Sequence, residues 1–317
     1  MGRFLLRRLA SSVVVLFTVS VLTFLIFEVI PNGNPALRLA GRTATPGNIA
    51  AVEKAYGFDK PVYVQYLRTM EQVFTGKIVS YAQNLNVVSQ LRQDLPVTAS
   101  LVLGAAALWI VMGIALGLIA GLHAGGKIDT GITVLNFVGI SAPSFVIGYV
   151  LIYLFSFKLH VFPSSGYVGL SDPLAWADHL IMPWFSLAVL YTGIYAQVLR
   201  ATVVDVLHED HVRTARAKGL TRRRVLVHHV LRTSLIPIVS LSGLDIAAVL
   251  GGSAIIIEVV FNLPGIGNYA SQSIGALDVP PVLVITMFGA FAVVLFSTIT
   301  DVIYALLDPR IRVARSA

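Results

Sequence analysis

The sequence predicts an all-α, polytopic membrane protein with six transmembrane helices. Of its 317 residues, 56% are hydrophobic and 12% are charged, whereas a soluble domain usually carries about 25% charged residues. The mean hydropathy of +0.81 agrees with this class. Six apolar stretches have about the 20 residues that a membrane helix needs. Lysine and arginine are distributed unequally among the segments between them.

The expected spans cover residues 9–30, 97–122, 131–157, 180–204, 235–261 and 282–307. The first is longer than the apolar core of a cleavable secretion signal, about 7–15 residues, and no A-x-A site follows it. We therefore expect a retained membrane helix. Pro143 and Pro183 fall within the third and fourth spans, where neighbouring groups can satisfy the carbonyls that a proline leaves free.

Small residues recur at a spacing that lets membrane helices approach each other closely. They are Gly113, Gly117 and Gly121 in the second span and Gly251 and Gly252 in the fifth. Helix packing is their expected role.

The loop between the first two spans, residues 31–96, is long enough to contain helices of its own. Its sequence predicts one helix before and one after residues 57–61. Thr45 followed by Pro46 fits the start of the first helix, and Pro61 fits the start of the second. We expect three parts: the N-terminal end with the first span (1–30), an external loop domain resting on the spans (31–96), and a core transmembrane domain (97–317) with a basic loop at 205–234.

The distribution of basic residues predicts the orientation of the chain. If the spans alternate in direction, fifteen of the 23 lysines and arginines lie on the same side as the N-terminus. Seven of the other eight lie in the long loop 31–96, which counts little toward orientation, and the short loops on that side hold only Lys158. Because cytoplasmic loops carry the excess of basic residues, we expect both termini to be cytoplasmic.

Residues 205–234 read as helix, turn and helix on the cytoplasmic side. Each basic side chain here would cost roughly 2.5–3.5 kcal/mol at the centre of a membrane helix, so the segment must face water, phosphate groups or protein. We expect a first helix from 205 to 218, with Asp205, Glu209 and Asp210 near its positive end. Gly219 fits a left-handed C-terminal cap, and Thr221 fits the N-cap of a second helix over 222–232.

The segments RTARAKGL (213–220) and LRTSLIP (231–237) resemble the EAA loop of importer-type ABC permeases, in its peptide-transporter form. The general motif is E-A-A-x3-G. Here Arg213, Thr214 and Ala215 occupy its leading positions and Gly219 is its glycine, so arginine replaces the leading glutamate, as is common in the peptide subfamily. Further segments resemble family signatures in the expected order: IPNGNPA (30–36, with Asn34 in place of Asp), YGFDKPVYVQYL (56–67), GGSAIIIEVVFNLPGIGNYA (251–270) and DVIYALLDPRIR (301–312).

The resemblance implies a type I ABC importer fold with a small external helical insertion and a cytoplasmic coupling helix. The chain would be the permease subunit of an ATP-driven, binding-protein-dependent importer of di- or oligopeptides. It would be non-catalytic and would form half of the translocation pathway in the lipid of the bacterial cytoplasmic (inner) membrane. The implied ATPase-coupling residues are Arg213, Thr214, Ala215, Arg216, Ala217, Lys218, Gly219 and Leu220.

The implied partners supply everything that this chain would lack. A second, homologous permease subunit would complete the pathway, and an external substrate-binding protein would deliver the peptide. One or two cytoplasmic ATPase subunits would bind ATP and magnesium, while this chain would hold no cofactor and no metal.

Residues 121–128 (GLHAGGKI) match the spacing of a phosphate-binding loop. That motif needs Ser or Thr after its lysine and a strand before it, whereas Ile128 follows here and a membrane span precedes. ATP is therefore expected on another chain. His208 and His211 lie one helical turn apart, close to His228 and His229, a spacing compatible with a metal site; a solvated or partner-facing helix is the expected interpretation. The chain has no cysteine, and no catalytic triad stands out.

Asp245 and Glu258 lie within the fifth span, where acidic side chains are costly and usually face a cavity or a partner. Both are candidates for lining or gating the pathway. A hydrogen bond across helices is an equal alternative for Asp245, and a structural role near the external gate is favoured for Glu258. Asp301 is expected to be structural. Residues 262–267 (NLPGIG) are a candidate contact for the substrate-delivery protein, although tight turns alone would explain their glycines.

Other functional classes remain open at this stage. An ion-coupled secondary transporter of small solutes would favour inverted repeats and ionic sites at the midplane; no repeat is visible, and Asp245 is the one plausible central charge. A nucleic-acid binder would need base-reading or stacking groups, but residues 213–232 contain no Phe, Tyr or Trp, so no nucleic-acid partner is expected. Among ABC importers, nickel chelates and glutathione are alternative cargoes.

Overall fold

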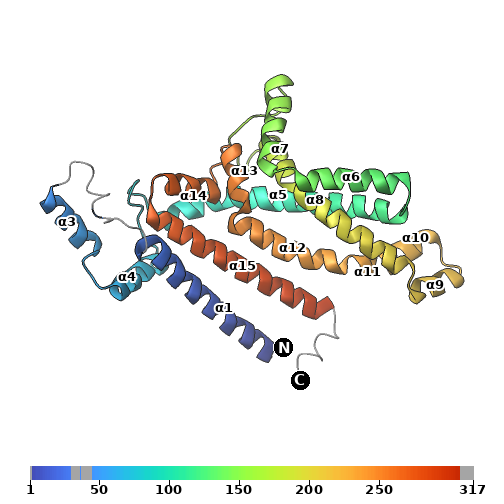
Figure 1. Ribbon diagram of the computed structural model, residues 1–317, viewed down its shortest axis with the longest axis horizontal. Helices are drawn as coiled ribbons and strands as arrows, with labels where there is room; N and C mark the ends of the chain where they lie inside the picture. Colours follow the sequence, from blue (N-terminus) through green and yellow to red (C-terminus); the bar gives the residue numbers. More distant parts are fainter. Residues whose placement is uncertain (1, 30–35, 37–44, 308–317) are drawn as a thin grey trace. The chain divides into compact units, whose positions relative to one another are not determined.

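The computed structural model describes residues 2–29, 36 and 45–307, with the backbone alone for residues 2–9 and 301–307. All the regular elements in these ranges are helical, and an isolated antiparallel bridge joins Val79 to Asn86 (Figure 1). Two compact units are present: Met1–Pro96 with Gly265–Val294, called unit 1, and Val97–Pro264 with Leu295–Ala317, called unit 2. The sequence features at 30–35 and 308–312 and the side chain of Asp301 lie outside the described residues.

Five helical segments in the described ranges are long and apolar enough to cross a membrane, and a bent pair makes a sixth if it is one span. This confirms the expected membrane class. The five are Ala10–Val29 in α1 (Gly2–Phe24) and η1 (Leu25–Val29), α5 (Val87–Leu122), α8 (Pro173–Leu207), Ile236–Val260, and Val279–Thr300 in α15 (Val279–Leu307).

The second span begins earlier than the expected residue 97, because α5 starts at Val87. The side chain of Asn86 accepts a hydrogen bond from the Ser89 amide at 2.8 Å and so caps this end. Polar residues such as Arg92 lower the hydropathy of residues 87–96, so this first part of the helix was not predicted as membrane span. Val87 is nevertheless fully buried in the core of unit 1.

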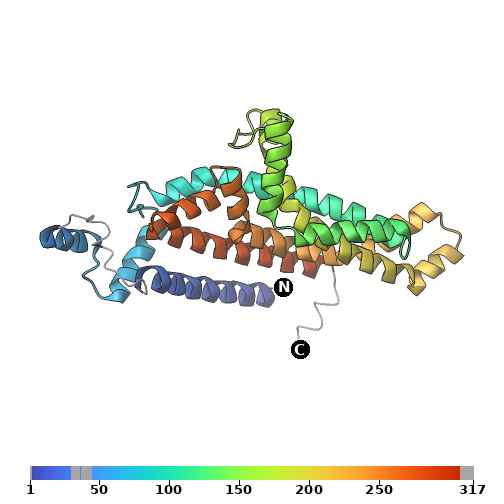
Figure 2. The same cartoon turned by 45° about the horizontal axis from the view of Figure 1, so that its top comes forward.

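The expected third span is broken at Pro143. The structure has two helical pieces, α6 (Lys127–Ser141) and α7 with η2 (Ser144–Leu151 and Ile152–Lys158), bent by 99° at the break. Pro143 has no amide hydrogen, and it forces Ala142 out of the helical conformation to φ −84° and ψ 123°. The steep angle between α6 and α7 is visible in both views (Figures 1 and 2). By contrast, Pro183 lies inside an unbroken α8.

Unit 1 contains the helices expected in the external loop. Helix α3 (Pro46–Tyr56) is capped by Thr45, whose hydroxyl accepts from the Asn48 amide at 3.3 Å, and it ends at Gly57 in the left-handed region. Helix α4 (Val62–Phe74) begins directly after Pro61. These three boundaries agree with the sequence prediction. The unit's core contains Phe24, Met70, Ile78, Val87, Tyr269, Leu283 and Val284.

Unit 1 also fixes the turn that follows α4. The buried carboxylate of Asp278 accepts hydrogen bonds from the Ser80 hydroxyl and from the Tyr81 amide, the latter at 2.9 Å.

Burial, reinforced by the charges of Asp278 and Asp94, raises the pKa of Tyr269 to about 12. Its hydroxyl therefore stays protonated at physiological pH.

In unit 2, α8 packs against α6, α7 and the C-terminal half of α5. The spacing of Gly113, Gly117 and Gly121 explains the close approach of α5. A Cβ at Gly117 would lie 2.7 Å from the Ala196 carbonyl, and one at Gly121 would lie 2.8 Å from Val203. The expected packing role fits these contacts. Gly252 differs, because no atom lies within 4 Å of a Cβ built there; it belongs to the kink η4 (Val249–Ser253) between α12 (Ile236–Ala248) and α13 (Ala254–Val260).

Candidate functional site

The basic segment forms a helical hairpin at the end of α8 (Figures 1 and 2). Helix α9 (Asp210–Ala217) is followed by α10 (Arg222–Val225), η3 (Leu226–Leu231) and α11 (Arg232–Ser234). The expected start at residue 205 is wrong, since Asp205 lies in the last turn of α8 and the chain breaks at His208 and Glu209. Val206 and Val212 are both buried in the core of unit 2, so the chain has to turn between them.

The turn after α9 is a Schellman motif. Gly219 has φ +76°, the left-handed conformation that glycine adopts without strain. Its amide donates to the Arg216 carbonyl at 2.9 Å, and the Leu220 amide donates to the Ala215 carbonyl at 3.4 Å. The expected cap at Gly219 therefore agrees with the structure. Thr221 occupies the N-cap position of α10, but its side chain makes no capping hydrogen bond, contrary to expectation.

Helix α9 has one anchored face and one open face. Val212 and Ala215 are buried in the hydrophobic core of unit 2. His211 contacts the other arm of the hairpin, with its Nε2 3.4 Å from the His229 carbonyl oxygen, while its Nδ1 lies 2.9 Å from Glu209 at the start of α9. The open face presents the exposed side chains of Arg213, Thr214, Arg216, Ala217 and Lys218. The hairpin is thus packed on the membrane helices while a polar, basic surface stays accessible to a partner.

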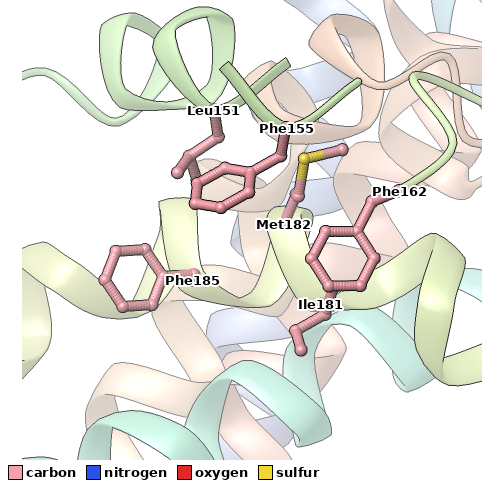
Figure 3. A pocket seen from close by; sticks show the side chains of 6 residues that line it. All are labelled: Leu151, Phe155, Phe162, Ile181, Met182 and Phe185. Atoms are coloured by element: carbon pink, nitrogen blue, oxygen red, sulfur yellow. The ribbon is translucent and has the colours of Figure 1, made fainter. Parts of the chain in front are cut away.

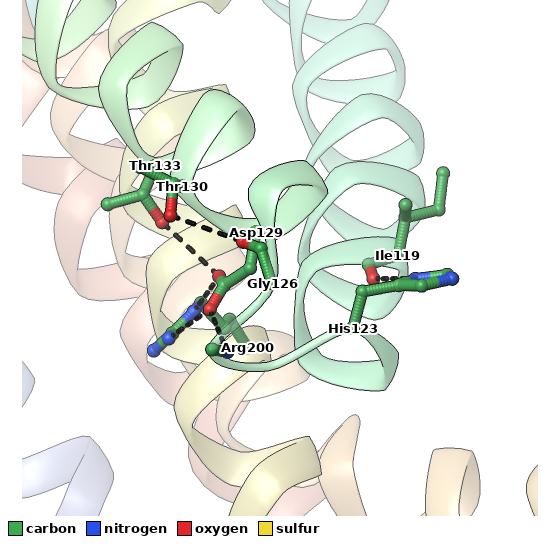
Figure 4. A network of polar contacts seen from close by, with 8 residues as sticks. Ile119, His123, Gly126, Asp129, Thr130, Thr133 and Arg200 are labelled. Atoms are coloured by element: carbon green, nitrogen blue, oxygen red, sulfur yellow. Dashed lines mark hydrogen bonds and ion pairs between the residues drawn. The ribbon is translucent and has the colours of Figure 1, made fainter.

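A second polar contact lies near the base of the hairpin, on α6 and α8 (Figure 4). The Arg200 guanidinium donates to both carboxylate oxygens of Asp129, with its Nη2 2.6 Å from Oδ2. Asp129 also accepts from the Gly125 amide at 2.8 Å, and Thr133 lies 3.4 Å away. Arg200 is ten residues before the first residue of α9, so this pair joins the turn between α5 and α6 to the helix that carries the hairpin.

The glycine-rich segment 121–128 is the turn between α5 and α6. Helix α5 precedes it, and Gly125 adopts φ +78°. The Gly125 amide, which would have to face a phosphate in a nucleotide cradle, donates instead to Asp129. The segment therefore has neither the preceding strand nor the open amide that a phosphate-binding loop requires.

Asp245 is one of the two expected pathway residues, and it lies on α12. Its Oδ2 accepts a hydrogen bond from the Tyr195 hydroxyl on α8 at 2.8 Å. Tyr195 is fully buried and Asp245 is partly exposed. Trp109 on α5 stacks on Tyr191 at 4.6 Å and lies edge-on to Tyr195. These side chains form a group of aromatic residues around one carboxylate, which we call the aromatic–Asp245 cluster.

Glu258, the other expected pathway residue, lies on α13 and is fully buried. Its Oε1 accepts from the Thr98 hydroxyl on α5 at 2.7 Å. Full burial beside a hydrogen-bond donor favours a structural role for Glu258, as the sequence analysis favoured. In these two hydrogen bonds the carboxylates bond different helices, Asp245 to α8 and Glu258 to α5.

An apolar hollow lies between the α7–η2 segment and α8 (Figure 3). Its lining consists of Leu151, Phe155, Phe162, Ile181, Met182 and Phe185. None of these side chains can orient a polar ligand by hydrogen bonding. The hollow therefore lacks the convergent polar groups of a specific solute site.

Comparison with known proteins identifies the family. The family model for the binding-protein-dependent transport system inner membrane component matches residues 113–313. The N-terminal model for the membrane component of the same systems matches residues 1–102. The chain belongs to this permease family.

Similar curated proteins match the permease along nearly its whole length. A probable peptide ABC transporter permease of Sinorhizobium fredii is 35% identical, with 98% of this chain and 100% of the relative aligned. The oligopeptide transport system permease AppB of Bacillus subtilis is 34% identical, with 98% of this chain and 99% of the relative aligned. The dipeptide transport system permease DppB of Lactococcus lactis is also 34% identical, with 98% of this chain and 100% of the relative aligned.

A solved structure supports the fold of the permease. The crystal structure of an amino acid ABC transporter with histidines matches with a TM-score of 0.53 at 16% identity, covering 68% of this chain and 93% of that one. The likeness shows the type I importer fold that the sequence predicts. The permease is therefore a multi-pass membrane subunit of a binding-protein-dependent transport system.

The permease places the implied coupling residues on one short helix and its closing turn. No sequence pattern predicted the pairing of Asp129 with Arg200, because the partners are far apart along the chain; an acid and an arginine at the ends of membrane helices were the available hint. In the described part of the chain, no group of three or more His, Asp or Glu side chains could hold a metal ion. His208 faces its own helix, with Nδ1 2.8 Å from the Val204 carbonyl oxygen.

Proposed function

We propose that this permease imports di- or oligopeptides and that α9 couples it to cytoplasmic ATPase subunits. The peptide cargo is supported by the full-length similarity to permeases named for peptide, oligopeptide and dipeptide transport. The single observation that carries the coupling role is α9 itself, a helix packed by Val212 and Ala215 while its basic face stays exposed.

In this proposal the permease is non-catalytic, and partner ATPases bind ATP and magnesium. Closure of the ATPases pushes on the face formed by Arg213, Thr214, Arg216, Ala217 and Lys218. Since α9 is fixed to α8 through buried contacts, its displacement moves the membrane helices and shifts the equilibrium between inward-open and outward-open states. A second permease subunit completes the pathway, and an external binding protein loads it. Both chain termini are cytoplasmic.

The coupling role predicts the effect of replacing Gly219. A valine there is strained at φ +76°, although the space around Gly219 is open. Gly219→Val should therefore distort the Schellman turn and lower peptide uptake at least about tenfold, the effect of roughly 1.4 kcal/mol, while the chain still reaches the membrane. Gly219→Asn is the matched control, because asparagine tolerates the left-handed region. It should keep most uptake.

Three measurements test this pair of variants: uptake in cells, recovery of the ATPase subunits with the tagged permease, and ATP hydrolysis by the recovered complex. Equal uptake by Gly219→Val and the natural chain would exclude coupling through this turn. Loss of uptake with normal ATPase recovery and normal ATP hydrolysis places the defect in transmission of the motion.

The cargo is tested by uptake of labelled solutes in a strain whose natural gene for this permease is deleted. We expect that returning the gene for this permease to that strain restores uptake of a dipeptide or a pentapeptide. This uptake should be abolished when the partner ATPase carries an inactive nucleotide site. Uptake of glutathione or a nickel chelate without any peptide would contradict the proposed cargo. Uptake that persists with the inactive ATPase would favour ion-coupled transport instead.

A further inference from the structure

Helix α4 carries an apolar face that is exposed among the described residues of unit 1. Tyr63, Leu67 and Phe74 are 69%, 63% and 81% exposed. At about 100° per residue, these three positions lie within about 40° of one another on the helix. They therefore form one stripe, which we call the α4 stripe.

The covered side of α4 lies next to this stripe. Met70 is buried, and Tyr66 and Val73 pack against the same core. The opposite side carries the exposed polar residues Arg68 and Gln72. The apolar side of α4 therefore has two parts. One part packs on the core of unit 1, and the other, the α4 stripe, needs another apolar environment.

The depth of the contact with α1 indicates which environment that is. Tyr66 reaches α1, where its hydroxyl lies 2.8 Å from the Ser20 hydroxyl and its ring meets Phe24 edge-on at 5.4 Å. Ser20 already donates to the Phe17 carbonyl at 2.8 Å, so the Tyr66 hydroxyl is the donor in this pair. Ser20 and Phe24 lie nine and five residues before Val29, the last described residue of this candidate span, or about 14 and 8 Å at 1.5 Å per residue.

These depths lie within the bilayer, whose hydrocarbon core is about 30 Å thick. Interfacial helices bury their apolar face about 5–10 Å into the boundary of headgroups and acyl chains, and the contact at Phe24 lies in this range while Ser20 lies deeper. The exposed surface of α1 continues one turn below the contact at Phe17, which is 60% exposed. The α4 stripe is therefore continuous with a surface that already faces lipid.

The polar side of α4 is compatible with such a position. The Gln65 amide donates to the carbonyls of Phe58 and Lys60 at 3.1 and 2.7 Å. The Thr75 hydroxyl donates to the Glu71 carbonyl at 2.6 Å. These side chains are satisfied by backbone oxygens within the unit, while Arg68 and Gln72 point away from the stripe and can reach water.

We propose that α4 is an interfacial helix whose stripe of Tyr63, Leu67 and Phe74 inserts between the lipids of the outer leaflet beside α1. The occupant of this surface is the acyl-chain region of the bilayer. This anchors the external domain to the membrane surface independently of the cargo and of the coupling mechanism proposed above.

Single-cysteine labelling tests the proposal directly, because the natural chain contains no cysteine. Leu67→Cys and Phe74→Cys place a small fluorophore on the stripe, and Gln72→Cys places it on the opposite side as the matched control. Each full-length variant is reconstituted into phosphatidylcholine vesicles. Quenching is measured with a nitroxide on carbon 5 of the acyl chain and, separately, with aqueous iodide.

We expect the lipid-borne nitroxide to quench the labels at 67 and 74 at least about twofold more than the label at 72, as for a helix inserted at the interface. Iodide should show the reverse order. Iodide quenching at 67 that equals the value at 72 would overturn the proposal. Shielding of positions 67 and 74 from both quenchers would also overturn it, since a protein partner would then cover the stripe.

Discussion

At the scale of single residues, the Asp129–Arg200 pair has the clearest energetic consequence. The Asp129 side chain is 5% exposed and that of Arg200 is 32% exposed. Removing one partner of this ion pair leaves the other charge without compensation, whereas removing both can be nearly neutral. We expect Asp129→Asn and Arg200→Gln each to lower thermal stability and uptake. The double variant should be no worse than the more damaging single variant.

The test is a double-mutant cycle on the melting temperature of the purified permease, with uptake measured in parallel. Coupled residues give non-additive effects. Losses that add in the double variant would mean that the two side chains act separately. Thr202→Ala, on the same helix, is a control outside the pair, because the Thr202 hydroxyl bonds only to the Val198 carbonyl in the described contacts.

Substitutions of Tyr195 and Asp245 distinguish a structural role of Asp245 from a role in the translocation pathway. Tyr195→Phe keeps the ring but removes the donor to a partly buried carboxylate, which should cost about 1–3 kcal/mol of unfolding free energy. Asp245→Asn keeps an oxygen that accepts the same hydrogen bond and removes only the charge. If Asp245 acts in the pathway, Asp245→Asn should retain stability and lose uptake. Normal uptake by this variant would restrict Asp245 to packing.

At the scale of elements, the approach of α5 to α8 depends on glycine. In Gly117→Ala the new methyl would lie 2.7 Å from the Ala196 carbonyl oxygen and 2.9 Å from the Leu199 Cβ. Backbone atoms cannot move aside easily, so we expect a loss of about 1–3 kcal/mol, typical of overpacking. Gly131→Ala on α6 is the control. No atom lies within 4 Å of its Cβ, and alanine favours the helix by about 1 kcal/mol.

Thermal unfolding of both glycine variants in the same detergent measures this difference. A Gly117→Ala protein as stable as the Gly131→Ala protein would show that α5 and α8 tolerate a wider separation than the structure has.

Local signals predicted the elements whose boundaries depend on local chemistry. Thr45 with Pro46, and the left-handed Gly219, are set by hydrogen bonds between residues a few positions apart, so the sequence contains the whole cause. The bend at Pro143 was missed, because proline is compatible with both a continuous and a broken membrane helix. Pro183 illustrates the continuous case, and only packing against neighbouring helices decides between the two. The break at Glu209 likewise depends on the burial of Val206 and Val212.

At the scale of the whole molecule, the distribution of basic residues predicts which segments face the cytoplasm. Lys54→Cys on α3 and Arg216→Cys on α9 are exposed positions in an otherwise cysteine-free chain. In intact spheroplasts, a membrane-impermeant maleimide should label position 54 and not position 216. Inverted vesicles should give the opposite result. Labelling of position 216 in sealed spheroplasts would contradict cytoplasmic placement of the hairpin.

Membrane class and family could both be predicted from the sequence, because apolar length and several short motifs indicate them. The candidate site was only partly accessible. The eight residues 213–220 were found as a motif, but their anchoring by Val212 and Ala215 needed the fold. The contacts of Asp129 with Arg200 and of Ser20 with Tyr66 join residues 71 and 46 positions apart. Neither pair has a periodic or local signature.

The break at Pro143 also has a consequence for biogenesis. Each half of the bent segment has about 15 residues, or about 22 Å of helix, less than the roughly 30 Å of the hydrocarbon core. Until α8 has emerged, the chain therefore offers the translocon two segments that are each too short to cross. Helix α8 packs on both halves, and a Cβ at its Gly193 would lie 2.8 Å from the Asn136 carbonyl oxygen. We therefore expect stable insertion of the third span to wait for the synthesis of the fourth.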